Sequence, residues 1–178
     1  MQDTKPDHTG VLTTLFAHNG WANRKLLDFC EQLSDEQLDA TAIGGFGSIR
    51  ATLWHIVGAE VSYVYRVNRK LPPQPVSRGV FPGFAVMKDV AQWTNDELLQ
   101  LALSAQPDTI VTENEGSKHV AYPLASLIMQ AINHATEHRA QIAAIITQLE
   151  MEPPDMSGWM YMEENGDFKE WRTGVEDA

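Results

Sequence analysis

Apolar residues recur at steps of three and four along residues 9–32, a spacing that is typical of one face of an amphipathic helix. This stripe consists of Leu12, Leu15, Phe16, Ala22, Leu26, Phe29, Cys30 and Leu33, with Asn19 in the same register. Trp21 points away from the stripe, so we expect its indole to contact either the C-terminal segment or a partner subunit. Ser34 and Gln37 have the spacing of a capping box, which predicts a short helical turn over residues 34–38.

A second helix is predicted from Ser48, a natural N-cap, to about residue 68, after a break that holds Gly44, Gly45 and Gly47. Such a helix is roughly 30 Å long. Residues 70–85 contain four prolines and cannot be helical throughout. Because about sixteen extended residues reach some 55 Å, this segment can return along the whole helix and let the second and third helices run parallel.

The rest of the chain is also mainly helical in pattern. Residues 86–105 predict a weaker helix, in one or two pieces, with Thr94 and Glu97 at capping-box spacing inside it. Residues 109–112 and 118–122 flank a turn at 114–116 and predict a small hairpin. Residues 123–150 form the clearest helix, and we expect part of residues 155–178 to pack back on the bundle. The apolar seam of that clearest helix consists of Leu124, Ile128, Ala131, Ala135, His138, Ile142, Ile145 and Leu149. We expect one domain over residues 1–178, with its core at about 10–162 and a tail at 163–178.

Composition narrows the functional classes. The chain has 178 residues and a formal net charge of -11, so nucleic acid and anionic membrane surfaces are poor partners. It has no apolar run long enough to cross a bilayer and no secretory signal pattern at its start, which predicts a cytoplasmic protein. Cys30 is the only cysteine, which we expect in the core, so metal ligands must come from His, Asp or Glu.

Two histidines interrupt the best helical seam. His134 and His138 are four residues apart, so both side chains lie on one face and can reach one ion. Spacing alone leaves two interpretations open. Either both histidines bind one metal ion, or one is a core histidine that is hydrogen-bonded to a side chain and the other lies at the surface. The pattern is neither the His-Glu-x-x-His of zinc peptidases nor the Glu-x-x-His of di-iron bundles.

The other histidines are less clear. His55 lies off the main apolar stripe of its helix, on a face of small residues that leave room for a cavity. Ser62 and Arg66 share this face, and either line a pocket or are simply solvated. His8, His18 and His119 are expected at the surface, although His18 could approach a site from the first helix.

Three segments together resemble the DinB/YfiT-like bundle proteins. Residues 16–23, FAHNGWAN, resemble the first-helix pattern (F/Y)-x-x-N-x-W-A-N of that family. Residues 53–56, LWHI, followed by Ala59 and Glu60, are similar to its second-helix histidine motif, and residues 133–142, NHATEHRAQI, to its His-x-x-x-His-R-x-Q-I motif. Pro153, Pro154 and the residues after them look like the family's usual ending. The resemblance covers about residues 10–162.

The resemblance implies an all-α four-helix bundle of up-down-down-up topology, with the long crossover between helices two and three. It also implies that His55, His134 and His138 bind one divalent metal ion, nickel or zinc before iron or manganese. Three neutral imidazoles leave coordination positions for water or substrate, as in catalytic sites.

Relatives of this fold include S-transferases that use low-molecular-weight thiols such as bacillithiol, and a mycothiol-dependent isomerase. The resemblance therefore implies a thiol-dependent S-transferase that acts on small electrophiles in detoxification or stress response, and often a homodimer. A metal-dependent hydrolase that uses metal-bound water is the first alternative. A stress-related metal- or ligand-binding protein without turnover is the second. The sequence identifies no general base.

Overall fold

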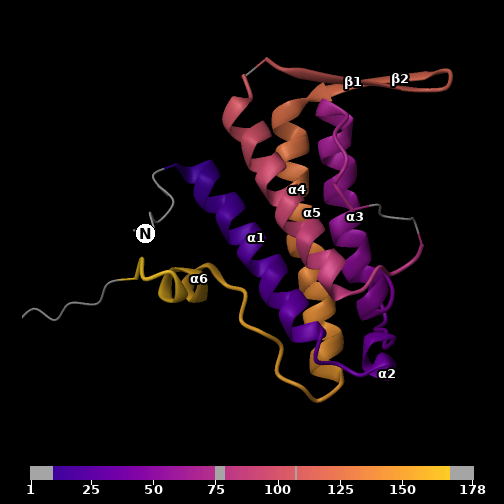
Figure 1. Cartoon of the computed structure of the whole chain (residues 1–178), viewed down its shortest axis with the longest axis vertical. Helices are drawn as coiled ribbons and strands as arrows, with labels where there is room; N and C mark the ends of the chain where they lie inside the picture. The colour runs from indigo at the N-terminus through magenta and orange to yellow at the C-terminus, as the bar shows by residue number, and fades with distance from the viewer. Residues whose placement is uncertain (1–9, 75–78, 107, 169–178) are drawn as a thin grey trace, which may run out of the picture.

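The fold is a bundle of four long helices, seen in a computed structural model that describes residues 10–74, 79–106 and 108–168 (Figure 1). The long helices are α1 (Val11–Cys30), α3 (Ile49–Asn68), α4 (Phe84–Ser104) and α5 (Leu124–Gln148). The smaller elements are the helices α2 (Asp35–Leu38) and α6 (Gly158–Glu164) and the strands β1 (Ile110–Glu115) and β2 (Lys118–Pro123). The two strands pair antiparallel as a hairpin across one end of the bundle. The predicted fold class is confirmed, hairpin included.

The predicted helix starts are confirmed at two serines. The Ser48 side chain accepts a hydrogen bond from the Ala51 backbone N–H at 3.2 Å and so begins α3. At α2, Ser34 and Gln37 form a capping box in which each side chain bonds the other residue's backbone. These bonds satisfy N–H groups that have no partner within the helix.

The connection between α3 and α4 lets these two helices run parallel. Contacts between them advance in the same direction along both: Glu60 meets Thr94, and further on Asn68 donates to Glu97 at 3.2 Å. α1 and α5 run the opposite way, which gives the up-down-down-up order (Figure 1). α3 packs against both α4 and α5, and α1 does the same, so α1 and α3 occupy opposite corners of the bundle.

The α5 seam is buried as predicted, but the start of the α1 stripe is not. Ala135 and Ile142 are fully buried in the core. Leu12 and Leu15, by contrast, are 40% and 41% exposed. They lie in the first turns of α1, where they border an open apolar groove with residues of α4 and α5. Periodicity identified their face correctly, but at this end of the bundle that face is only partly covered.

α4 is a single helix of 21 residues, which removes the option of two pieces. Thr94 is not an N-cap, because its hydroxyl donates to the Ala91 carbonyl within the helix and to the Glu60 carboxylate. The capping-box spacing of Thr94 and Glu97 therefore does not mark a helix start. Thr94 instead makes a polar contact with Glu60 in the bundle interior.

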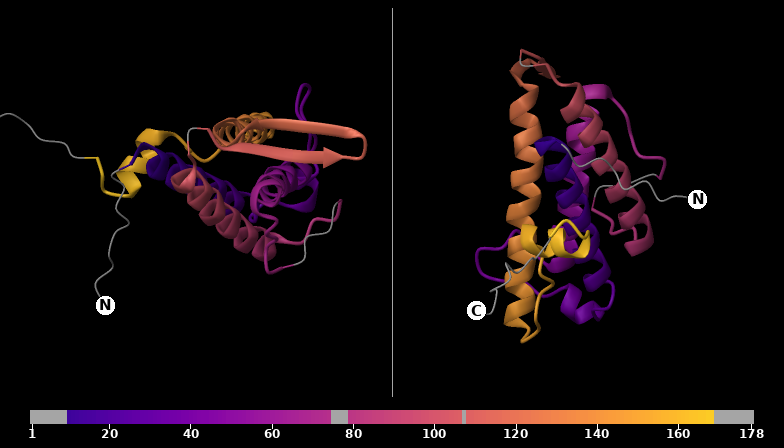
Figure 2. Two further views of the ribbon diagram at one scale, coloured as in Figure 1. Left: turned by 90° about the horizontal axis from the view of Figure 1, so that it is seen from above. Right: turned by 90° about the vertical axis from the view of Figure 1, so that its left-hand side faces the viewer.

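The C-terminal segment packs back on the bundle through α6, which lies against α1 (Figures 1 and 2). Tyr161 is buried there, and the Trp21 indole N–H donates to the Glu164 carboxylate at 2.9 Å. Of the two contacts expected for Trp21, the structure therefore shows the C-terminal segment. Part of the predicted tail, residues 169–178, lies outside the described residues. None of the described helices is long and apolar enough to cross a membrane.

Candidate metal centre

The helix α5 presents two histidines toward α3. His134 and His138 are one helical turn apart, and their ring centroids are 4.4 Å from each other. His138 is buried and His134 partly buried. The predicted pairing of these two side chains on one face of α5 is confirmed by this geometry.

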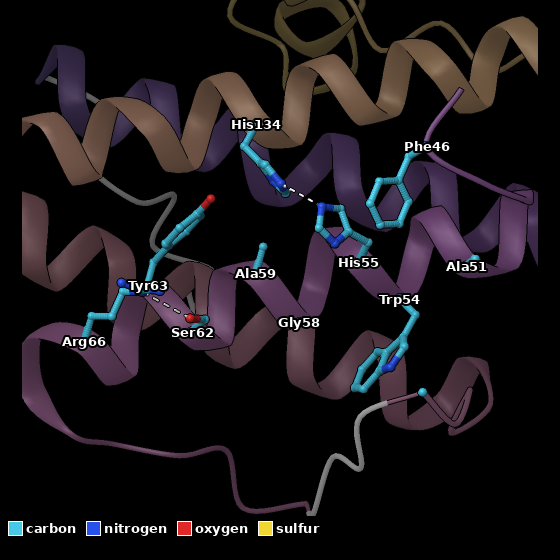
Figure 3. Close-up of a pocket in the computed structure, with 11 residues that line it drawn as sticks. Phe46, Ala51, Trp54, His55, Gly58, Ala59, Ser62, Tyr63, Arg66 and His134 are labelled. Carbon is cyan, nitrogen blue, oxygen red and sulfur yellow. Dashed lines mark hydrogen bonds between the residues drawn. The ribbon is translucent and has the colours of Figure 1, made fainter. Parts of the chain in front are cut away.

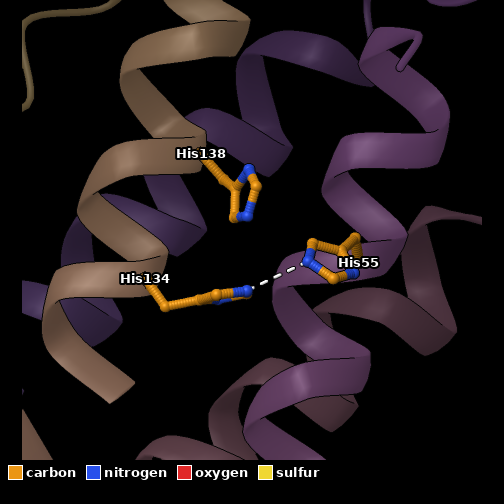
Figure 4. Close-up of side chains that lie close together, drawn as sticks. All are labelled: His55, His134 and His138. Carbon is orange, nitrogen blue, oxygen red and sulfur yellow. Dashed lines mark hydrogen bonds between the residues drawn. The ribbon is translucent and has the colours of Figure 1, made fainter. Parts of the chain in front are cut away.

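His55 of α3 meets this pair across the interface between the two helices (Figure 4). Its Nε2 atom lies 3.0 Å from the His134 Nε2 atom, and its ring centroid lies 4.7 Å from that of His138. One ligand nitrogen from each of the three residues can be chosen so that all lie within 4.8 Å of one another. The structure therefore brings together the three histidines that the family resemblance implied.

The separations are close to those around a single ion. Two imidazole nitrogens about 2.1 Å from a tetrahedral Zn²⁺ ion lie roughly 3.4 Å apart. The 3.0 Å contact between His55 and His134 is slightly shorter than this value, and the widest separation exceeds it by little more than an ångström. Small side-chain rotations are sufficient to accommodate an ion, so the three residues fit one.

Gln141 and Phe46 contact the histidines and orient them, Gln141 by a hydrogen bond to His138 and Phe46 by stacking on His55. The Gln141 side-chain oxygen lies 2.8 Å from the His138 Nδ1 atom and also accepts the backbone N–H of Phe46 at 3.2 Å. Because an amide oxygen can only accept, the His138 Nδ1–H donates in this contact, which leaves Nε2 as the atom that could bind an ion. The Phe46 ring stacks on His55 with centroids 3.9 Å apart and an interplanar angle of 16°.

The surroundings keep two of the imidazoles neutral. Burial, and after it the neighbouring histidines His138 and His55, together lower the pKa of His134 to about 4. Burial and His138 also lower the pKa of His55. Neutral imidazole is the form that binds a metal ion. The His134 Nδ1 atom is buried and has no hydrogen-bond partner among the described residues, and unsatisfied polar atoms of this kind occur at functional sites.

A cavity of about 480 Å³ opens beside the cluster along α3 (Figure 3). This volume is in the range of small-molecule sites. His55 and His134 line it at one end, and Ser62 and Arg66 line it further along the same helix. Of the two interpretations left open for Ser62 and Arg66, the structure supports the pocket. The residues of the cavity wall are Phe46, Ala51, Trp54, His55, Gly58, Ala59, Ser62, Tyr63, Arg66, Gly79 and His134.

The two other histidines that the structure describes, His18 and His119, take no part in the cluster. His18 is half-buried rather than at the surface: its Nε2 atom donates to the Met156 carbonyl at 2.9 Å, and its ring packs edge-on against Tyr161. It therefore belongs to the contact with the C-terminal segment. His119 is exposed on β2 as expected, and His8 lies outside the described residues.

Cys30 is fully buried in the core, as predicted. Burial raises the pKa of its thiol to about 12. Because the thiolate is the reactive form, this cysteine has no role as a nucleophile or metal ligand.

A second polar cluster, deeper in the bundle, was not identified from the sequence. Glu60 is fully buried, and its carboxylate accepts hydrogen bonds from Asn19, Asn23 and Thr94 at 2.9–3.0 Å. The Arg139 guanidinium donates to the side-chain oxygens of both asparagines, at 2.8 and 2.7 Å. Burial raises the pKa of Glu60, against the effect of these partners, and lowers that of Arg139 to about 10. The one sequence feature that could have indicated this cluster is the pair Asn19 and Asn23, which lie four residues apart on the apolar face of α1.

Comparisons with known proteins agree with this architecture. A family model described as the DinB family matches residues 1–173. The crystal structure of a DinB-like protein from Bacillus cereus is similar, with a TM-score of 0.58 and 19% sequence identity, covering 82% of this chain and 96% of that chain. At this identity the structural similarity supports the fold alone. No curated protein matches the chain.

Proposed function

The chain belongs to the DinB family, and we propose that it is a divalent-metal-dependent S-transferase in which His55, His134 and His138 hold the ion. The observation that carries this proposal is the position of the histidines: they converge on one point, and two of them also line a cavity of small-molecule size. Three neutral nitrogen ligands with an open side are typical of a catalytic rather than a structural centre.

The donor set is compatible with nickel or zinc, the two ions that the family resemblance puts first. Imidazole suits zinc, nickel, copper and iron, and no described carboxylate or thiolate joins the three histidines in the cluster. An ion held there supplies Lewis acidity, which lowers the pKa of a thiol or a water molecule that binds to it.

The cavity wall favours a thiol over water as the nucleophile. None of the described residues that line the cavity is Asp or Glu, so no carboxylate stands there as a general base. A thiol has a pKa near 8.5 and needs only a modest shift to ionise at neutral pH, whereas water needs a far larger one. The aromatic side chains of Phe46, Trp54 and Tyr63 provide apolar surface for a small electrophile.

Metal analysis of the purified protein tests the centre first. We expect about one equivalent of divalent metal in the wild type and a large loss in His134→Ala. His119→Ala is the matched control, because this histidine is exposed on the hairpin away from the cluster. Equal metal content in wild type and His134→Ala would remove the basis of the proposal.

Turnover is tested next with metal-loaded protein, a low-molecular-weight thiol and monochlorobimane. Thiol–bimane conjugation that is lost in His55→Ala supports the transferase. Ester hydrolysis without thiol would support the hydrolase instead, and metal binding without either reaction would support a binding protein. A role in detoxification and the homodimer implied by the resemblance remain predictions. Light scattering on the purified protein tests the dimer.

A further inference from the structure

Four residues of α3 form a straight row along the cavity. His55, Ala59, Ser62 and Arg66 follow one another at steps of four, three and four, so they share one face of the helix (Figure 3). The two middle residues are small and leave the space between the ends open. One end of the cavity therefore carries histidines and the other a guanidinium.

The guanidinium of Arg66 turns back toward the histidines. Its Nε atom donates to the hydroxyl of Ser62, the residue one helical turn nearer to His55, at 3.3 Å. Ser62 is seven residues beyond His55, so the two ends of the cavity are separated by roughly 10 Å along the helix axis.

The charge of Arg66 is unusual for its place. It is the only Lys, Arg, Asp or Glu among the described residues of the cavity wall, in a chain of formal net charge -11. With a divalent cation at the histidines, each end of the cavity carries a cationic group, and Glu113 balances the charge of the one at the Arg66 end. A ligand that matches this pattern carries a metal-binding atom at one end and an anionic group at the other.

Arg66 is partly paired already. Its Nη1 atom donates to the Glu113 carboxylate at 2.6 Å, and the Tyr122 hydroxyl donates to the same oxygen. Tyr122 and Arg66 both hold the pKa of Glu113 below its usual range, so this carboxylate is ionised. A guanidinium carries five N–H groups, and the bonds to Glu113 and Ser62 use one Nη1 donor and Nε, which leaves donors for a ligand.

We propose that Arg66 is a specificity residue that binds a carboxylate of the substrate, about 10 Å from the end that meets the metal ion. This inference rests on the proposed function, and it names the substrate class: an acidic small-molecule thiol. Glu113 competes with the substrate for the guanidinium and so tunes the affinity.

Two thiols of matched length test the proposal by calorimetric titration into zinc-loaded protein. The probes are 6-mercaptohexanoate and the neutral 6-mercaptohexanol. We expect the acid to bind about tenfold more tightly to the wild type, because a hydrogen-bonded ion pair is added. Arg66→Gln should abolish this preference without changing the affinity for the neutral thiol. Equal binding of both thiols to the wild type, or an unchanged preference in Arg66→Gln, would overturn the proposal.

Substitution of Glu113 tests whether Arg66 recognises the substrate carboxylate or serves only in a structural ion pair with Glu113. Glu113→Gln breaks the same pair but releases the guanidinium, so the preference for the acid should be kept or increased several-fold. If the ion pair only fastens the hairpin to α3, Glu113→Gln and Arg66→Gln should impair binding alike, which would contradict the proposal. Arg66→Lys replaces Arg66→Gln if the latter does not fold, and should retain part of the preference.

A pair of ligands without sulfur distinguishes failure of this inference from failure of the proposed function. Adipate and hexanoate differ by one terminal carboxylate. If neither thiol binds but adipate binds more tightly than hexanoate in an Arg66-dependent way, the thiol chemistry is wrong and Arg66 still recognises an anion. If both thiols bind equally and adipate has no advantage, the metal centre stands and the role of Arg66 is wrong.

Discussion

Replacement of Glu60 by alanine should be among the most destabilising single changes in this chain. The Glu60 carboxylate comes from α3 and accepts hydrogen bonds from Asn19 and Asn23 of α1 and from Thr94 of α4. The same two asparagines accept from Arg139 of α5. One side chain therefore takes part in a network to which all four long helices contribute.

The cost follows from what the substitution leaves behind. In Glu60→Ala, the side chains of Asn19 and Asn23 lose an acceptor, Thr94 keeps only its bond to the Ala91 carbonyl, and the Arg139 guanidinium, which is 3% exposed, loses the carboxylate of its network. Breaking a buried ion network from one side costs roughly 3–5 kcal/mol. Because each kcal/mol shifts the thermal midpoint of a domain of this size by about 2–4 °C, we expect the midpoint of thermal unfolding to fall by about 6–20 °C.

Urea denaturation of the metal-free protein measures the change in the free energy of unfolding, and a thermal melt measures the shift of the midpoint. Glu137→Ala is the matched control, a glutamate of the same chemistry that is exposed on α5 and should change the free energy of unfolding by less than about 0.5 kcal/mol. Glu60→Gln keeps the volume and several hydrogen bonds but loses the charge, so its cost should be intermediate, about 2 kcal/mol. If Glu60→Ala cost no more than Glu137→Ala, the network would not stabilise the bundle.

Three further predictions concern the site and the helix packing. His134 has a folded-state pKa near 4, below its ordinary value of 6.5, so the unfolded chain binds a proton between these values that the folded chain does not. The metal-free protein should lose stability as the pH falls from 6.5 to 4, and His134→Leu should reduce that dependence in urea titrations at each pH. A Cβ atom on Gly20 would lie 2.6 Å from the buried Asn95 side chain, whereas one on Gly58 meets nothing within 4 Å. Gly20→Ala should therefore cost about 1–3 kcal/mol and Gly58→Ala gain up to about 1 kcal/mol in thermal unfolding. Phe46→Ala should speed the release of bound zinc to a chelator, because this ring covers one face of the cluster; an unchanged rate would show that the ring does not shield the ion.

The helices could be predicted because their signals are local. Serine N-caps and steps of three and four need no knowledge of distant residues, and the structure has both. The pairing of His134 with His138 is local in the same sense, since both are on one face of one helix. His55 was different: nothing in the spacing of α3 says which residues of α5 lie opposite, and only the resemblance connected them.

The errors have a common physical cause. The apolar positions Leu12 and Leu15 were expected in the core, and the Thr94 pattern suggested a helix start. Periodicity shows which face of a helix is apolar, but not how far along its length a neighbour covers that face. Similarly, Asn19 was placed in the apolar stripe of α1, but its partners Glu60 and Arg139 come from other helices, which a pattern within one helix does not reveal.

The buried network and the histidine cluster share the same two helices. Arg139 directly follows His138 on α5, and Glu60 lies five residues beyond His55 on α3. In each helix, therefore, one polar side chain belongs to the buried network while another belongs to the histidine cluster. A rotation of α5 by about 30° would move its side-chain ends, some 5–6 Å from the axis, by roughly 3 Å.

A shift of that size would break the bonds from Arg139 to Asn19 and Asn23, which are 2.7–2.8 Å long. The same rotation would shift the His138 side chain by a similar distance relative to His55. The buried network thus opposes the motion that would separate the histidines. We conclude that the Arg139 contacts and the buried apolar seam of α5 both restrict the rotation of this helix, and with it the positions of His134 and His138 in the candidate metal centre.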